Sequence, residues 1–171
     1  MAASFRVNGR PVRCQDVGDA FLTDLLRDEL GLCGTKVACG IGVCGLCTVL
    51  IDDVPASACL VPAICAEDQD VWTIEGVAEA VETGVEFSER IPLKVARQVI
   101  EAFVSADAVQ CGICTPGQGI SAIALFAESP FPDDQEIRRH MSGNLCRCTG
   151  YQSILRALTI VSHALSVERD A

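Results

Sequence analysis

The sequence predicts an α+β chain in two parts, an N-terminal β-grasp followed by a C-terminal four-helix bundle. Three observations lead to this prediction. Short strand patterns surround one helical segment in the first part of the chain, and apolar residues recur at helical spacing in the rest. Eleven cysteines are present, and eight of them fall into two groups of four, one group in each part.

A β-hairpin is expected to open the chain. Residues 5–14, "FRVNGRPVRC", contain two short strand patterns on either side of Asn8-Gly9, a pair typical of the type I′ turn. Two further strands are expected, at 48–52 ("TVLID") and at 71–76 ("VWTIEG"), with a turn at Asp52-Asp53 after the first of them. Two strands, a helix and then further strands is the order of elements in a β-grasp.

The helix between these strands is predicted over 19–31, "DAFLTDLLRDELG". Asp19 is suited to cap its start and Gly31 to end it. Four leucines recur at helical spacing, so one face of this helix is expected to be apolar and to cover the sheet. These residues are Leu22, Leu25, Leu26 and Leu30.

A linker is predicted over 76–90, "GVAEAVETGVEFSER", because this stretch is acidic and rich in small residues. It would separate a first domain, 1–75, from a helical second domain, 91–171. A short helix capped by Asp133 is expected within "PDDQEIRRHMSG". Three other helices are indicated by apolar stripes, which we assign to the core: Ala96, Val99, Ile100, Phe103 and Val104; Ile120, Ile123, Ala124 and Ala127; Tyr151, Ile154, Leu155, Leu158, Val161 and Leu165.

The composition excludes several kinds of function. The formal net charge is −10 and no run of lysine or arginine occurs, which argues against nucleic-acid binding. No stretch of about 18 apolar residues is present, so no membrane span is expected, and the start lacks a secretory signal, so we expect a cytoplasmic protein. Disulfides are rare in the reducing cytosol, so a dense thiol pattern there indicates metal binding or redox chemistry.

The first cysteine group has the spacing C-x4-C-x2-C, followed after eleven residues by a fourth cysteine. This is the plant-type spacing for a [2Fe–2S] cluster. Three thiolates must converge within nine residues, and the glycines between them allow the tight curl and leave N–H groups free to point at sulfur. A zinc site, which usually shows two C-x2-C pairs, is the alternative. The group comprises Cys39, Cys44, Cys47 and Cys59.

The second group has the spacing C-x2-C, then 31 residues, then C-x-C. Taken alone, this spacing is closer to a zinc pattern. However, each pair directly precedes an expected helix start, Thr115-Pro116 and Thr149-Gly150 respectively. Helix N-termini favour negative charge, so they suit a thiolate-bound [2Fe–2S] core. The group comprises Cys111, Cys114, Cys146 and Cys148.

The segments "QCGICTPG" and "GNLCRCTGY", preceded by a plant-type loop, resemble the small iron–sulfur subunit of the molybdenum hydroxylases, the xanthine oxidase family. The segments "LCGTKVACG" and "VWTIEG" also occur where that family has similar sequences. The resemblance covers residues 4–165, and all eight grouped cysteines stand at the family's spacings.

The resemblance implies two [2Fe–2S] clusters in this chain. It implies that Gln110 contacts the pterin of the molybdenum cofactor, since a side-chain amide is both donor and acceptor. The cluster nearer to the molybdenum centre would be held by Cys111, Cys114, Cys146 and Cys148, and the cluster nearer to the flavin by Cys39, Cys44, Cys47 and Cys59.

The implied partners are a large molybdopterin-binding subunit and a medium FAD-binding subunit, in a heterotrimer or a dimer of heterotrimers. The chain would be the electron-transfer subunit of this oxidoreductase and would contain no complete active site of its own. The competing hypotheses are a zinc-stabilised protein-interaction module and a stand-alone ferredoxin. The first leaves the plant-type spacing unexplained, and the second leaves the C-terminal part without a purpose.

One departure from the family concerns the first loop. Ile41, Val43 and Leu46 stand where the family commonly has Glu, Gly and Ala. These apolar side chains either form an interface with a flavin subunit or pack inward, and the sequence leaves both open.

The remaining candidate residues are assigned no ligand role. Arg147, between two cysteines, either tunes the potential of the cluster or is simply solvated. The two histidines, His140 and His163, stand in no metal motif. We expect the three ungrouped cysteines to be buried and to pack as small hydrophobic residues. These are Cys14, Cys33 and Cys65.

Overall fold

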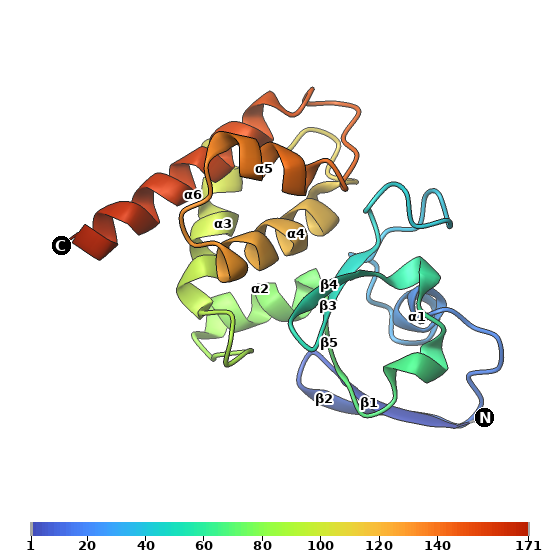
Figure 1. Ribbon diagram of the computed structural model, residues 1–171. Coiled ribbons are helices and arrows are strands. Elements are labelled where there is room, and N and C mark those ends of the chain that lie inside the picture. The colour runs from blue at the N-terminus through green and yellow to red at the C-terminus, as the bar shows by residue number, and fades with distance from the viewer. Residues whose placement is uncertain (1, 171) are drawn as a thin grey trace.

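The structure, a computed structural model, describes residues 2–170. A mixed five-stranded sheet with a short helix makes up the N-terminal part, and helices make up the C-terminal part (Figure 1). The chain is therefore of the α+β class, as the sequence predicts. The elements are β1 (Ala3–Val7), β2 (Arg10–Cys14), α1 (Leu22–Asp24), η1 (Leu25–Glu29), β3 (Thr48–Ile51), β4 (Val54–Ser57), η2 (Ala58–Leu60), η3 (Ala63–Ala66), β5 (Asp70–Trp72), α2 (Ile74–Thr83), α3 (Leu93–Ser105), α4 (Thr115–Glu128), α5 (Asp134–Met141) and α6 (Gln152–Asp170).

The sheet has the strand order β2-β1-β5-β3-β4. β1 pairs antiparallel with β2 and parallel with β5, so strands from both ends of this part lie side by side. The predicted hairpin is confirmed, since Asn8 and Gly9 have φ angles of 52° and 75°, the positive values that a type I′ turn requires. Asp52 and Asp53, at 49° and 68°, form the predicted turn between β3 and β4.

The helix predicted over 19–31 is shorter than expected. It consists of α1 and a π-helical turn, η1, and begins after Phe21. Asp19 does not cap it. The side chain of Asp24 instead reaches back and accepts a hydrogen bond from the Phe21 N–H at 3.1 Å. The leucine face is confirmed for the three residues that are buried with the sheet, Leu22, Leu25 and Leu26.

The segment expected as a linker, 76–90, begins within a helix. β5 ends before this point and α2 starts at Ile74, so the strand expected over 71–76 is also shorter than predicted. Val77 and Ala80 face the core, and two of the acidic residues that indicated a linker, Glu79 and Glu82, lie on the exposed side of this amphipathic helix.

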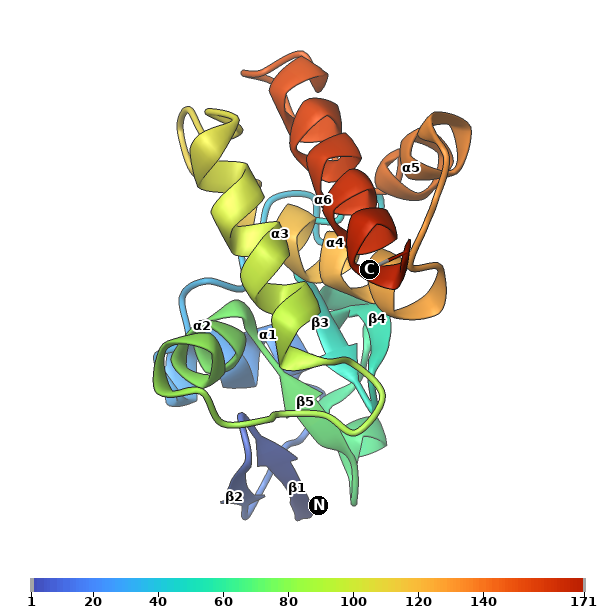
Figure 2. The same cartoon turned by 90° about the vertical axis from the view of Figure 1, so that its left-hand side faces the viewer.

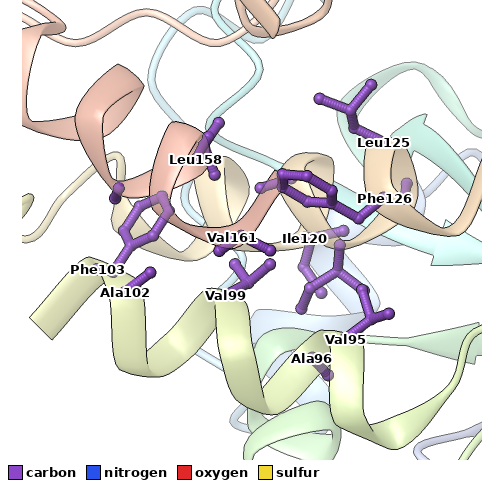
Figure 3. Close-up of a cluster of buried hydrophobic side chains, with 14 of the residues drawn as sticks. Val95, Ala96, Val99, Ala102, Phe103, Ile120, Leu125, Phe126, Leu158 and Val161 are labelled. Atoms are coloured by element: carbon purple, nitrogen blue, oxygen red, sulfur yellow. The ribbon is translucent and has the colours of Figure 1, made fainter. Parts of the chain in front are cut away.

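One apolar core joins the helices of the C-terminal part. α3 packs along α6 (Figure 2). Most of the predicted stripe residues are buried, although Val104 is 73% exposed. Figure 3 shows side chains of α3, α4 and α6 that point toward one another: Val99, Phe103, Ile120, Phe126, Leu158 and Val161.

Two predicted helix starts have different outcomes. Asp133 caps α5 as expected, because its Oδ1 accepts hydrogen bonds from the N–H groups of Gln135 and Glu136 at 2.9 and 2.8 Å. In α4 the cap is Cys114 rather than Thr115. The second cysteine group is therefore one residue closer to this helix N-terminus than expected.

The two parts of the chain pack against each other, each with its own buried apolar cluster. Leu50 of β3 belongs to the same buried cluster as the helices, and β3 packs against α4 (Figure 1). This packing holds the loop that precedes β3 near the loops that precede α4 and α6. Across residues 2–170, no helix has both the length and the apolar character needed to cross a membrane.

Candidate metal centres

The first cysteine group lies mainly on the loop that runs into β3. Cys44 and Cys47 are buried, whereas Cys39 is partly exposed at the outer side of the loop. Positive φ angles curl the backbone around these thiols, a conformation that favours glycine over any residue with a Cβ. They occur at Gly40 (65°), Gly42 (72°) and Gly45 (66°).

The four thiols of this group adjoin in two pairs. Cys44 lies close enough to Cys39 to lower its pKa, and Cys59 lies close enough to Cys47 to perturb its ionisation. Cys44 is also close enough to Cys47 to perturb its ionisation. The fold thus brings together all four residues that the sequence grouped, including Cys59 from the separate 3-10 turn η2.

Hydrogen bonding and burial act on these thiols in opposite directions. The N–H groups of Ile41 and Cys44 lower the pKa of Cys39 to about 6, with the Ile41 N–H lying 3.5 Å from the Cys39 sulfur. Burial raises the pKa of Cys47 to about 11. Metal binding requires thiolates, so occupation of this loop by a metal would release the proton of such a buried thiol.

The second cysteine group is assembled from two loops. Cys111 and Cys114 lead into α4, and the other two cysteines precede α6. The sulfurs of Cys111 and Cys148 lie 3.4 Å apart. Cys114 and Cys146 form the other adjoining pair, and Cys146 is also close to Cys111. All four predicted residues therefore come together here as well.

The thiols of the second group also differ in proton affinity. Burial, and then the neighbouring Cys146, raises the pKa of Cys114 to about 12. Burial opposes the ionisation of Cys146, but hydrogen bonds from Thr149 lower its pKa overall, with the two side chains 3.1 Å apart. The Ile113 N–H lowers the pKa of Cys111. The polar surroundings thus favour thiolates at two of the four positions.

The donor sets fit a binuclear core better than a single zinc ion. Each group offers four thiols as two adjoining pairs, and a [2Fe–2S] core takes four cysteine thiolates on two irons. None of the eleven cysteines forms a disulfide.

The other predicted residues lie mostly at the surface. Gln110 is exposed beside the exposed Cys111, and Arg147 is exposed as well. On the first loop, Ile41 and Val43 are 67% and 61% exposed, whereas Leu46 is buried. Two of the three apolar replacements therefore point outward and one points inward.

The expectation for the three ungrouped cysteines is confirmed only for Cys14, which is buried. Cys33 and Cys65 are exposed, so the prediction was wrong for them. Cys65 lies in the 3-10 turn η3, where one turn takes about three residues. Ala63 and Ala66 therefore face the core together, and Cys65 points to solvent.

Three polar residues lie near the second group: Asn144 and Gln118, which no sequence pattern described above indicates, and Tyr151, which the sequence predicts in the core stripe of the last helix but which precedes α6. Tyr151 has a φ of 65°, and its hydroxyl accepts a hydrogen bond from the Cys146 N–H at 3.0 Å. Asn144 and Gln118 are buried, at 4% and 0% exposure. A signal is nevertheless present, because Asn144 and Tyr151 flank the cysteine pair in "GNLCRCTGY" and Gln118 lies one helical turn after Cys114.

The two cysteine loops are in direct contact. The Leu145 N–H donates a hydrogen bond to the Cys44 carbonyl oxygen at 2.8 Å. Cys44 belongs to the first group, and Leu145 directly precedes Cys146 of the second. One hydrogen bond therefore joins the backbones of the two loops.

Comparison with protein families agrees with this two-site arrangement. Residues 5–70 match the family described as "2Fe-2S iron-sulfur cluster binding domain". Residues 73–159 match a second family, described as "[2Fe-2S] binding domain". The chain therefore contains two [2Fe–2S] binding domains.

Curated relatives and solved structures identify the larger group. The chain is 41% identical over 160 residues to a probable xanthine dehydrogenase subunit of Bacillus subtilis (strain 168), and the match covers 94% of this chain and 84% of that protein. It is 39% identical over 155 residues to "Xanthine dehydrogenase iron-sulfur-binding subunit" of Escherichia coli O157:H7, with 89% and 88% coverage. A chain of quinoline 2-oxidoreductase from Pseudomonas putida 86 superposes with a TM-score of 0.79 at 38% identity, covering 98% of this chain and 96% of that one. The chain therefore belongs to the iron–sulfur subunits of the xanthine dehydrogenase family of oxidoreductases.

Proposed function

We propose that this chain is the electron-transfer subunit of a molybdenum hydroxylase. When bound, two [2Fe–2S] clusters supply one-electron transfer between a molybdopterin centre in a large subunit and FAD in a medium subunit. The β-grasp domain, 1–75, holds the first cluster, and the four-helix bundle of the second domain, 91–171, holds the other. Their ligands are Cys39, Cys44, Cys47 and Cys59, and Cys111, Cys114, Cys146 and Cys148, respectively.

The observation that carries this proposal is the hydrogen bond between the two cysteine loops. At 2.8 Å, the bond from the Leu145 N–H to the Cys44 carbonyl connects a first-group cysteine to the residue before a second-group cysteine. Electrons tunnel more readily through a chain of bonds than across an equal gap. The bond therefore supports a relay, whereas two independent zinc sites would need no such link.

Each group also presents one side to a partner. Cys39 is partly exposed on the first loop, and Cys111 is exposed beside Gln110. We assign the first side to the medium subunit and the second to the large subunit. The Gln110 amide, with its donor and its acceptor, is placed to orient the edge of a pterin held by the large subunit.

The surface around Cys39 indicates the character of the medium subunit. The net charge of the chain is −10, yet residues 37–47 include no charged side chain. An exposed apolar patch of this kind is typical of an interface. We therefore expect the FAD-binding subunit to meet it with an apolar surface rather than with ion pairs. The patch consists of Val37, Ile41, Val43 and Leu60, at 49%, 67%, 61% and 53% exposure.

The three chains would form a heterotrimer or a dimer of heterotrimers. Eleven cysteines without a disulfide suit a reducing compartment, so we place the assembly in the cytoplasm.

Metal analysis of the native assembly tests the proposal. We expect about four irons and four sulfides for each copy of this chain, a red-brown colour and co-purification with two larger chains. A colourless protein containing zinc would contradict the redox function. Full iron content in a chain that purifies alone would instead indicate a free-standing ferredoxin.

A further inference from the structure

A second set of contacts surrounds the hydrogen bond between the two cysteine loops. The side-chain amide of Asn144 donates hydrogen bonds to the Gly45 carbonyl at 2.8 Å and to the Thr48 hydroxyl at 3.3 Å. The carbonyl of Asn144 in turn accepts a hydrogen bond from the Gln118 amide at 2.8 Å. Three segments that are far apart in the sequence are thus connected: the end of the first loop, the loop before α6 and the first turns of α4.

These contacts are largely buried. Asn144 is 4% exposed and Gln118 is 0% exposed. The Oε1 of Gln118 is buried and finds no hydrogen-bond partner among the described residues. Leaving such an atom unsatisfied costs about 1–3 kcal/mol, so an apolar side chain would be more favourable for packing alone. The Gln118 amide is therefore better explained by the bond that its nitrogen donates to Asn144.

Glycines allow the backbones to approach unusually closely at this point. A Cβ added at Gly45 would lie 2.3 Å from the Gly143 carbonyl oxygen, and a Cβ added at Gly117 would lie 2.3 Å from the Gly45 carbonyl oxygen. Real Cβ atoms do not make contacts of that length. The three segments are thus held closer than any other residue type would permit.

The position of these contacts relates them to electron transfer. Gly45 directly follows Cys44, and Asn144 directly precedes Leu145. The side-chain bond from Asn144 to Gly45 therefore runs beside the backbone bond from Leu145 to Cys44 and fixes its register. Loss of the side-chain bond would allow the two cysteine loops to separate without removing any thiol.

From this geometry we infer that Asn144 and Gln118 are positioning residues that set the distance, and hence the electronic coupling, between the two clusters. The inference rests on the proposed function, because it requires both cysteine groups to hold [2Fe–2S] clusters. A purely structural role would change stability but leave the coupling of the intact centres as it is.

The spin–spin interaction between the two reduced clusters reports the distance between them. Low-temperature EPR of the dithionite-reduced assembly would be compared for the natural protein and Asn144→Asp, which keeps the shape of the side chain and removes the N–H donors. We expect both signals to persist at full intensity and their mutual splitting to shrink, because dipolar coupling falls with the cube of the distance. Gln118→Met, which removes the support of Asn144, is expected to shrink the splitting less.

The chain contains one other asparagine, which serves as a matched control. The Asn8 amide donates to the Thr73 hydroxyl at 3.1 Å, and its oxygen accepts from the Thr73 N–H at 2.9 Å, and neither partner belongs to a cysteine loop. Asn8→Asp should leave the splitting unchanged.

The outcomes separate this inference from the proposed function. An unaltered splitting in both Asn144→Asp and Gln118→Met, or the absence of any splitting between two signals in the natural protein, would overturn the positioning role alone. The absence of one or both signals in the natural protein would overturn the proposed function itself. If Asn144→Asp fails to retain its clusters, the splitting in Gln118→Met tests the positioning role alone. A smaller splitting than in the natural protein supports that role, and an unaltered splitting overturns it.

Discussion

Gly117 offers a sharp test of how closely the two cysteine loops must approach each other. It lies in the first turn of α4, and a Cβ added there would be 2.3 Å from the Gly45 carbonyl oxygen and 3.2 Å from the Leu46 Cα. Ordinary contact begins at 3.4 Å, so Gly117→Ala would push the two backbones apart by about 1 Å. Backbone atoms cannot rotate away as the end of a flexible side chain can.

The size of the effect follows from two opposing terms. Overpacking costs about 1–3 kcal/mol. Replacement of glycine by alanine within a helix returns about 0.5–1 kcal/mol. The expected net loss for Gly117→Ala is therefore up to about 2.5 kcal/mol of unfolding free energy. Gly119 is the matched control, because it lies in the same helix and its added Cβ would meet only the Ile74 Cδ1, at 3.4 Å.

Urea titration followed by far-UV circular dichroism and by cluster absorption measures the difference. Gly117→Ala should unfold at a clearly lower urea concentration than the natural protein, and its cluster absorption should be lost at least as early as its helicity. Gly119→Ala should be as stable as the natural protein or more so. Equal midpoints for the two variants would refute the close approach of the loops.

Three further predictions concern the cluster loops and one helix cap. Ile41→Glu should weaken assembly with the FAD-binding subunit while the iron content stays full. Val54→Glu, at a second exposed apolar site, is the control. Equal assembly by the two variants would contradict the apolar interface. In the metal-free protein, alkylation of Cys39 should reach its full rate just above its pKa of about 6 and fall as the pH drops through that value, because only the thiolate reacts. A rate that keeps rising to about pH 8.5, as for an ordinary cysteine, would contradict the effect of the Ile41 N–H. Asp133→Ala should cost about 1 kcal/mol, measured by thermal unfolding, because two N–H groups lose their acceptor; an unchanged melting temperature would show that the cap contributes nothing.

The sequence predicts well the features that depend only on neighbouring residues. The Asn8-Gly9 turn needs only two residues that tolerate positive φ, and the Asp133 cap needs only one acceptor before a helix. The cysteine groups are a special case. Their members come from separate segments, yet the chemistry of a four-thiolate core restricts the spacing so strongly that eight positions can be grouped from sequence alone.

The features that the sequence does not predict depend on distant contacts. The bond from Asn144 to Gly45 spans 99 residues, and that from Gln118 to Asn144 spans 26. Nothing near Asn144 in the sequence indicates an acceptor so far away. Helix α2, which overlaps the predicted linker, is not predicted for a related reason, since the small, acidic composition of this segment indicates a helix only once Val77 and Ala80 are seen to face a core.

We propose that this one short chain holds two [2Fe–2S] clusters in electronic contact. The decisive measurement is EPR of the dithionite-reduced assembly, with spins quantified for each copy of this chain. We expect two distinct S = 1/2 signals of equal intensity, one for each cysteine group. A single signal would mean that one group binds something else, and no signal, with zinc present instead of iron, would contradict the proposed electron-transfer function.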